Sequence, residues 1–135
     1  MPGLDEEQIT MWGYWAPDVV KTEKVAISRL PILFKEHTNQ KATPALYASL
    51  IQEEFDEWRK EVSDQHNELK ELSDLVYVCY GYANAMGWNL DEAIHRVHKN
   101  NIGRCLQEDG TIRRREDGKI LKNPDYPKVN LKDLL

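Results

Sequence analysis

Two amphipathic helices are predicted by the stretches LYASLIQEEFDEW, at residues 46–58, and ELKELSDLVYVCYGYANAM, at residues 68–86. At about 100° per residue, the apolar side chains of the first stretch form one stripe along the helix. Glu54 falls within this stripe, Glu57 lies near its edge and Glu53 lies just outside it. Because the other charged residues fall on the opposite side, Glu54 occupies a position where a leucine would be expected.

The second stretch also places acids beside its apolar stripe. Glu71 lies at the edge of the stripe, and Asp74 follows one turn later. An unpaired carboxylate on a core-facing side costs several kcal/mol, so a stable protein must neutralise it, pair it or give it a metal ion. Two such helices packed antiparallel would present roughly four or five oxygen ligands, a set that suits Mg²⁺ or Mn²⁺. A solvated helix face is the alternative, and the shared phase of the two helices argues against it.

The same residues resemble a known family. The similarity to the MazG-like all-α nucleoside triphosphate pyrophosphohydrolases rests on LIQEEFDEW at residues 50–58 and KELSDLVYVCYGYANAMGWNLDEAIHRVHKNNIGR at residues 70–104. The family pattern is EExxE, a short spacer and then ExxD. The chain is most similar to the branch that resembles phosphoribosyl-ATP pyrophosphohydrolase in phages and bacteria, and the resemblance extends through DGKILKNPDY to about Tyr126.

The resemblance implies a fold, a reaction and a metal site. The implied fold is all-α, a four-to-five-helix antiparallel bundle of the all-α NTP pyrophosphatase type with a small C-terminal hairpin and an extended arm. The implied reaction is Mg²⁺-dependent hydrolysis of ribo- or deoxyribonucleoside triphosphates to nucleoside monophosphate and pyrophosphate, with Mn²⁺ as a substitute ion. Carried over to this chain, the metal ligands would be Glu54, Glu57, Glu71 and Asp74. Glu53 would then orient or deprotonate the attacking water, or complete a second metal site.

A third helical stretch offers residues for the substrate. Asn101 and Arg104 lie one turn apart near its C-terminal end, and we expect both to face inward. In the family, an Asn followed three residues later by a basic residue occupies these positions, usually with Lys where this chain has Arg. An amide can bind a base or sugar edge, and Arg can bind phosphate bidentately. A helix C-cap is the alternative role for Asn101.

Four further residues complete the set of site predictions. Lys119 and Lys122, in the segment that matches the family tail, are candidates to contact the phosphate chain of the same subunit or of a partner. His95 and His98 are predicted to be structural or surface residues, because Mg²⁺ prefers oxygen ligands.

Turn and cap signals predict where the elements begin and end. We expect a first helix from Asp18 to Leu30, which Pro31 ends or kinks, and a short helical segment from Ile32 to His37. Residues 60–67 have the composition of a turn between antiparallel helices. The later signals are a C′ glycine at Gly87, an N-cap at Asn89 with Glu92 three residues on, a helix end at Gly103, a hairpin across Asp117-Gly118 and an extended arm at residues 123–128.

Length and charge limit the classes of protein to consider. We expect the 135 residues to form a single domain, with an extension at 1–16, a helical catalytic core at 17–104, and a hairpin and C-terminal arm at 105–135. The net charge of −5 argues against general nucleic-acid binding. No apolar run approaches the length needed to span a bilayer, and the acidic N-terminus does not resemble a signal peptide. Cys79 and Cys105 are predicted to be free thiols in a reducing cytoplasm, which would be that of the host if the protein is phage-encoded.

Two other functions stay open at this point. One is a phosphoribosyl-ATP pyrophosphohydrolase of histidine biosynthesis, with a similar fold and metal chemistry. The other is a non-catalytic helical interaction module whose acids bind a structural ion. For the enzyme we expect a homodimer or homotetramer, because a chain of this size leaves one side of the acidic site open, and the aromatic residues Trp12, Tyr14 and Trp15 suit packing onto a neighbour.

Overall fold

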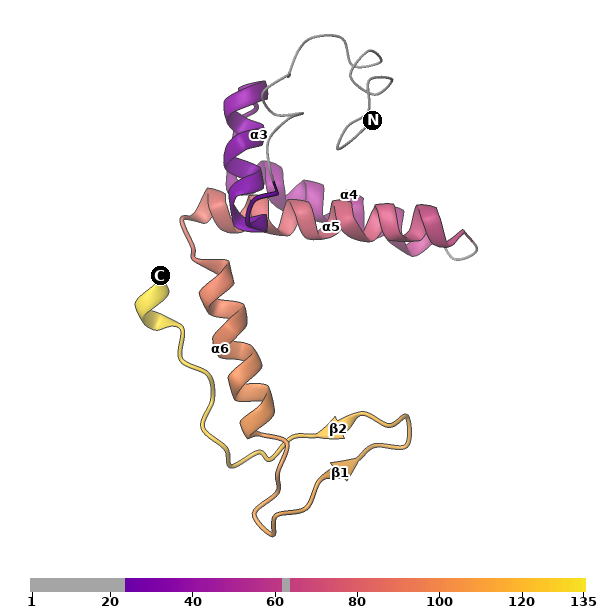
Figure 1. Cartoon of the computed structure of the whole chain (residues 1–135), viewed down its shortest axis with the longest axis vertical. Coiled ribbons are helices and arrows are strands. Elements are labelled where there is room, and N and C mark those ends of the chain that lie inside the picture. Colours follow the sequence, from indigo (N-terminus) through magenta and orange to yellow (C-terminus); the bar gives the residue numbers. More distant parts are fainter. Residues whose placement is uncertain (1–23, 62–63) are drawn as a thin grey trace. The chain divides into compact units, whose positions relative to one another are not determined.

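The computed structural model describes residues 24–61 and 64–135, which contain four α-helices and one small hairpin (Figure 1). The predicted all-α class with a C-terminal hairpin is confirmed. The chain divides into two compact units, up to Met86 and from Gly87 onward, and each is described by itself. The aromatic cluster at residues 12–15 and most of the predicted helix from Asp18 lie outside the described residues.

The first unit begins with a correction to the sequence prediction. Among the described residues, one 3₁₀ turn, η1 (Ile27–Arg29), precedes Pro31, and this proline then sits in the first turn of helix α3 (Leu30–Thr38). Pro31 therefore begins a helix and does not end one. The backbone N–H groups of a first helical turn make no hydrogen bond within the helix, so the missing N–H of proline costs nothing there. Helix α3 ends at Thr38, and its C-cap residue Asn39 adopts the left-handed conformation with φ of 57°.

Helix α4 (Pro44–Lys60) contains the stretch 46–58 that predicts it and begins two residues earlier. Pro44 occupies the first turn, and the Thr43 hydroxyl accepts a hydrogen bond from the backbone N–H of Leu46 at 3.2 Å. The side-chain oxygen thus satisfies one of the free donors at the helix N-terminus.

Helix α5 (Gln65–Met86) starts earlier than the turn predicted at residues 60–67 allows. Asp64 explains the difference, because its carboxylate accepts the backbone N–H groups of His66 at 3.0 Å and Asn67 at 3.3 Å. This N-cap draws three residues of the predicted turn into the helix.

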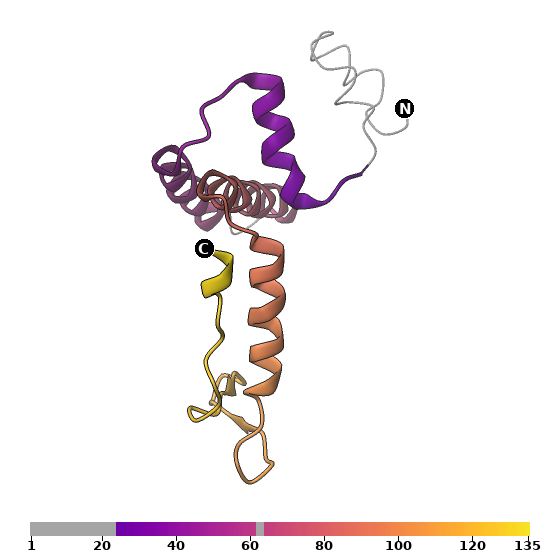
Figure 2. The ribbon, with the colours of Figure 1, turned by 90° about the vertical axis from the view of Figure 1, so that its left-hand side faces the viewer.

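Helices α4 and α5 pack side by side, and Figure 2 shows both nearly end-on with α3 crossing them. The core of this unit is small and centres on Tyr47, which is 3% exposed, together with Val78 and Ala83. The Tyr47 ring lies so close to Gly81 that a Cβ at this position would collide with it. Between α3 and α5, Phe34 and Tyr77 make an edge-to-face ring contact with centroids 6.1 Å apart.

The second unit is built on helix α6 (Leu90–Gly103). The Asn89 side chain accepts the backbone N–H of Glu92 at 3.1 Å, so the predicted N-cap is confirmed. Gly87, with φ of 75°, has the left-handed conformation expected of a C′ glycine after α5. At the other end, a side chain at Gly103 would collide with the ring of Tyr126.

The hairpin and the arm follow α6. Strands β1 (Arg113–Arg114) and β2 (Ile120–Leu121) pair antiparallel, which confirms the predicted hairpin. The arm then returns along α6, and it ends in the 3₁₀ turn η2 (Lys132–Leu134) (Figures 1 and 2). Asn100 donates to the carbonyl of Pro127 at 2.8 Å, so α6 holds the middle of the arm.

Two predictions from composition can be compared with the structure. Both cysteines are free thiols. None of the helices in the described part of the chain is both long and apolar enough to cross a membrane.

Candidate metal centre

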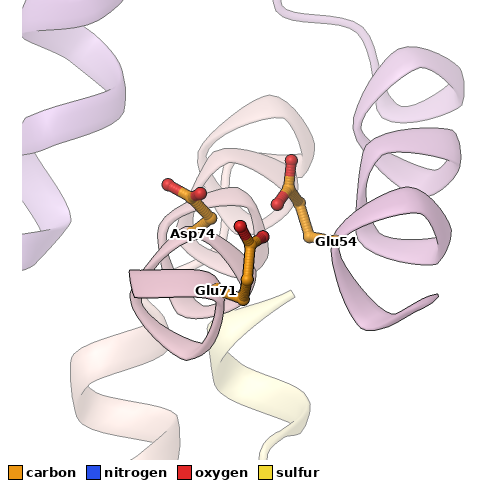
Figure 3. A group of neighbouring side chains, drawn as sticks. All are labelled: Glu54, Glu71 and Asp74. Carbon is orange, nitrogen blue, oxygen red and sulfur yellow. The ribbon is translucent and has the colours of Figure 1, made fainter. Parts of the chain in front are cut away.

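Three carboxylates from two helices converge in the first unit (Figure 3). Glu54 comes from α4, whereas Glu71 and Asp74 come from α5, and one oxygen of each lies within 4.8 Å of one oxygen of the others. All three residues are half-buried. A divalent cation with a preference for oxygen ligands fits this donor set.

The helical register of α4 and α5 produces this cluster. Glu54 lies about two turns beyond Tyr47 on the same face of α4. Asp74 lies about two turns before Gly81 on the same face of α5. Because Tyr47 packs on Gly81 in an antiparallel helix pair, two turns along the interface bring Glu54 next to Asp74. The residue predicted to replace a leucine therefore does lie on the helix face that packs against α5.

The electrostatics of the cluster show an excess of negative charge at Glu54. Its pKa is raised above the ordinary value of 4.5, first by desolvation and then by the charges of Asp74 and Glu71. Glu57 contributes to the same rise, and the charge of Lys70 opposes it. Burial and the neighbouring acids make the ionised form of Glu54 unfavourable. A bound cation would stabilise that ionised form.

One basic residue contacts the cluster directly. The Lys70 ammonium lies 2.8 Å from an Asp74 carboxylate oxygen and 3.2 Å from a Glu71 oxygen. These contacts raise the pKa of Lys70 above its ordinary value. Lys70 is not among the site residues predicted from the sequence, although its i,i+4 spacing to Asp74 is a common signal for an ion pair on a helix.

The remaining two acids of the EExxE motif lie apart from this group. Glu57 is exposed, and its carboxylate is not among the three that converge. Glu53 is also exposed, on the flank of α4 next to Glu54. Their predicted roles as a ligand and as the catalytic group stay predictions.

In the second unit, three predicted substrate-binding residues lie near one another. Lys122 donates to the side-chain oxygen of Asn101 at 2.8 Å, and the backbone N–H of Asn123 donates to the carbonyl of Arg104 at 2.8 Å. Asn101 lies within α6, and Arg104 is the C-cap residue, so the alternative role of Asn101 as a C-cap is wrong. Within the described residues, the Nε of Arg104 is buried without a hydrogen-bond partner.

Other candidates in this unit lie on the surface. Lys119 is exposed next to β2, and its carbonyl accepts the backbone N–H of Arg115 at 2.7 Å across the hairpin. His95 and His98 are exposed on α6, as predicted for residues outside the metal site.

A model of a known protein family matches part of the chain. The family model described as phosphoribosyl-ATP pyrophosphohydrolase matches residues 29–101. This range covers more than half of the chain, contains all five acids and Asn101, and ends before Arg104, Lys119 and Lys122. No curated protein matches the chain.

Proposed function

Because the chain belongs to the phosphoribosyl-ATP pyrophosphohydrolase family, within the MazG-like all-α superfamily, we propose that it hydrolyses nucleoside triphosphates to a monophosphate and pyrophosphate in a Mg²⁺-dependent reaction. The family indicates a hydrolase that releases pyrophosphate from a nucleotide. The triphosphate substrate and the ion are the parts that we propose. The observation that supports them most is the convergence of Glu54, Glu71 and Asp74.

The residues present fit a magnesium ion. The donors are carboxylate oxygens, the class that Mg²⁺ prefers, and the pKa of Glu54 is raised first by desolvation and then by the charges of Asp74 and Glu71. Glu54, Glu71 and Asp74 would hold the ion, with Glu57 as a fourth ligand, and Mn²⁺ would serve as a substitute. When bound, the ion would polarise the attacked phosphoryl group and lower the pKa of the attacking water.

Glu53 is the proposed general base. It adjoins Glu54 in the chain, it is exposed, and no ion pair or hydrogen bond of its side chain is found within the described residues. A base needs a free lone pair and access to water, and Glu53 has both. In the proposed step, the water oxygen bonds to the α-phosphorus, Glu53 accepts a water proton, and the α–β phosphoanhydride bond breaks to release pyrophosphate.

The substrate side of the proposal uses Asn101, Arg104, Lys119 and Lys122. The contact between Lys122 and Asn101 places an ammonium group beside an amide, and the buried Arg104 Nε retains an unused donor. Cationic and amide donors of this kind suit a phosphate chain and a base or sugar edge.

A second candidate function is hydrolysis of phosphoribosyl-ATP in histidine biosynthesis. The observation that favours it is the description of the matching family model. The same acids and the same bond cleavage would serve both substrates, so the two candidates differ in what surrounds the reacting phosphates.

Self-association into a homodimer or homotetramer in the cytoplasm is part of the proposal. The first unit leaves large apolar side chains open to solvent, with Leu69 64% exposed and Leu72 42% exposed. Leu72 also lines an apolar hollow of about 360 Å³, together with Ile27, Leu30, Ser73, Val76 and Tyr77. Helical phase places this hollow on the side of α5 away from the acids, so a second copy could cover it without closing the metal centre.

The experiment that tests the function is a substrate panel with product analysis. Ribo- and deoxyribonucleoside triphosphates and phosphoribosyl-ATP are incubated with Mg²⁺, and the products are separated. We expect a monophosphate plus pyrophosphate from one or more triphosphates, and no reaction in EDTA. Turnover of phosphoribosyl-ATP alone would favour the second candidate, and release of inorganic phosphate would contradict both.

A further inference from the structure

Lys70 contacts two of the three acids that converge in the metal centre. Its ammonium lies 2.8 Å from Asp74 and 3.2 Å from Glu71, from a position one residue before Glu71 on α5. Within the described residues, no other lysine or arginine forms an ion pair with Glu54, Glu71 or Asp74.

The ammonium group meets an electrostatic need of the cluster. Three carboxylates within 4.8 Å of one another repel, and the neighbouring charges of Asp74 and Glu71 act on Glu54 in the direction opposite to that of Lys70. A single positive charge between two of these acids reduces the repulsion. The same two carboxylates are the ones through which α5 would hold a divalent cation.

The Lys70 ammonium is also able to move away from Glu71 and Asp74. Its side chain is 61% exposed, against 14% for Glu71, and it consists of a flexible four-carbon stem with a strongly hydrated ammonium group. Such a group can move into solvent without disturbing the core of the helix pair.

We propose that Lys70 is an exchangeable counter-cation, which pairs with Glu71 and Asp74 while no divalent ion is bound and is displaced when the ion enters. This inference rests on the proposed function of the acids as a metal centre. Lys70 is therefore a residue that sets metal affinity by competition, and it stabilises the protein only in its metal-free state.

Competition links two measurable quantities. Suppose that Lys70 contributes stability only without metal. Removing its charge then lowers the free energy of unfolding of the metal-free protein, and it makes the free energy of Mg²⁺ binding more favourable by the same amount. Exposed ion pairs are weak, so we expect roughly a two- to fivefold decrease in the Mg²⁺ dissociation constant.

The experiment compares the full chain with Lys70→Met, Lys70→Arg and Lys60→Met. Calorimetry gives the affinity for Mg²⁺ alone, and urea unfolding is measured in EDTA and in saturating Mg²⁺. Lys60 is the matched control, because it ends α4, is exposed and forms no ion pair within the described residues. Lys70→Met should bind Mg²⁺ more tightly, unfold more readily in EDTA and match the wild type in saturating Mg²⁺. Lys70→Arg should bind no more tightly than the wild type, and Lys60→Met should equal it in every measurement.

Several results would overturn the inference. If Lys70→Met lost equal stability with and without Mg²⁺, the ion pairs of Lys70 would be ordinary structural contacts that persist when the metal is bound. Equal tightening by Lys60→Met would show a general charge effect and no displacement. If the wild type binds Mg²⁺ and Lys70→Met binds it with the same affinity, this inference alone fails. If the wild type binds no Mg²⁺, the proposed metal centre fails together with it.

Discussion

Tyr47 packs its ring directly against Gly81, where α4 and α5 approach closely. This contact fixes the register that brings Glu54 beside Asp74 about two turns further along the helix pair. The phenol ring on α4 and the missing side chain on α5 thus position acids that neither of them touches.

Gly81→Ala should lower the free energy of unfolding by about 1–3 kcal/mol, because the added methyl group overpacks the interface. This loss should exceed the gain of about 1 kcal/mol that alanine ordinarily brings to a helix interior. Urea unfolding in EDTA measures the change, with Ser49→Ala on the exposed side of α4 as a near-neutral control. A Gly81→Ala protein as stable as the wild type would contradict the close contact.

Glu54→Gln should remove a pH dependence from the metal-free protein. The pKa of Glu54 is raised in the folded state, so the folded protein binds more protons than the unfolded chain, and stability falls as the pH rises from below 4.5 through the raised pKa. Relative to the wild type in EDTA, Glu54→Gln should therefore gain stability as the pH rises across this window. Urea midpoints at a series of pH values test the sign, and a gain that shrinks with rising pH would refute the account of Glu54.

Glu53→Gln should separate binding from chemistry, because Glu53 is proposed to accept a proton and not to hold the ion. A general base contributes roughly 10²- to 10⁴-fold to the rate, so turnover should fall at least about a hundredfold. Affinity for Mg²⁺ and for a non-hydrolysable triphosphate should stay nearly normal by calorimetry. A parallel collapse of metal affinity would identify Glu53 as a ligand, and unchanged turnover would leave it no role in the reaction.

Asp133→Asn should loosen the end of the C-terminal arm. The Arg96 guanidinium binds both carboxylate oxygens of Asp133, at 2.6 and 2.9 Å, and also pairs with Glu92 at 2.7 Å. Because this ion pair is exposed, we expect hydrogen exchange at residues 131–135 to speed up only about two- to fivefold. Asp125→Asn, on an exposed part of the same arm, is the control. Equal exchange rates in the two variants would show that the Arg96–Asp133 ion pair does not hold the end of the arm.

The sequence predicted the helices and the acidic cluster because both depend on local pattern. Glu54 could be placed because its phase on α4 coincides with that of Tyr47, and the cap at Asn89 follows from residue type alone. The α5 start was missed because Asp64 acts as a cap within a polar stretch that otherwise suits a turn.

Individual side-chain contacts could not be predicted from the sequence. The collision that a side chain at Gly103 would make with Tyr126 depends on the path of the arm. The contact of Lys70 with Glu71 and Asp74 is local, but it depends on which way a flexible side chain turns. The charges and spacing of the residues permit such contacts, but they do not indicate which of the possible contacts form.

The proposed function depends on the binding of a divalent ion by Glu54, Glu71 and Asp74. Titration calorimetry of Mg²⁺ into the wild type and Glu54→Gln, both in their metal-free form, tests it most directly. We expect the wild type to bind Mg²⁺ and Glu54→Gln to lose at least about tenfold in affinity, a difference of about 1.4 kcal/mol, because a ligand is lost. Equal Mg²⁺ affinity in the two proteins would contradict the account.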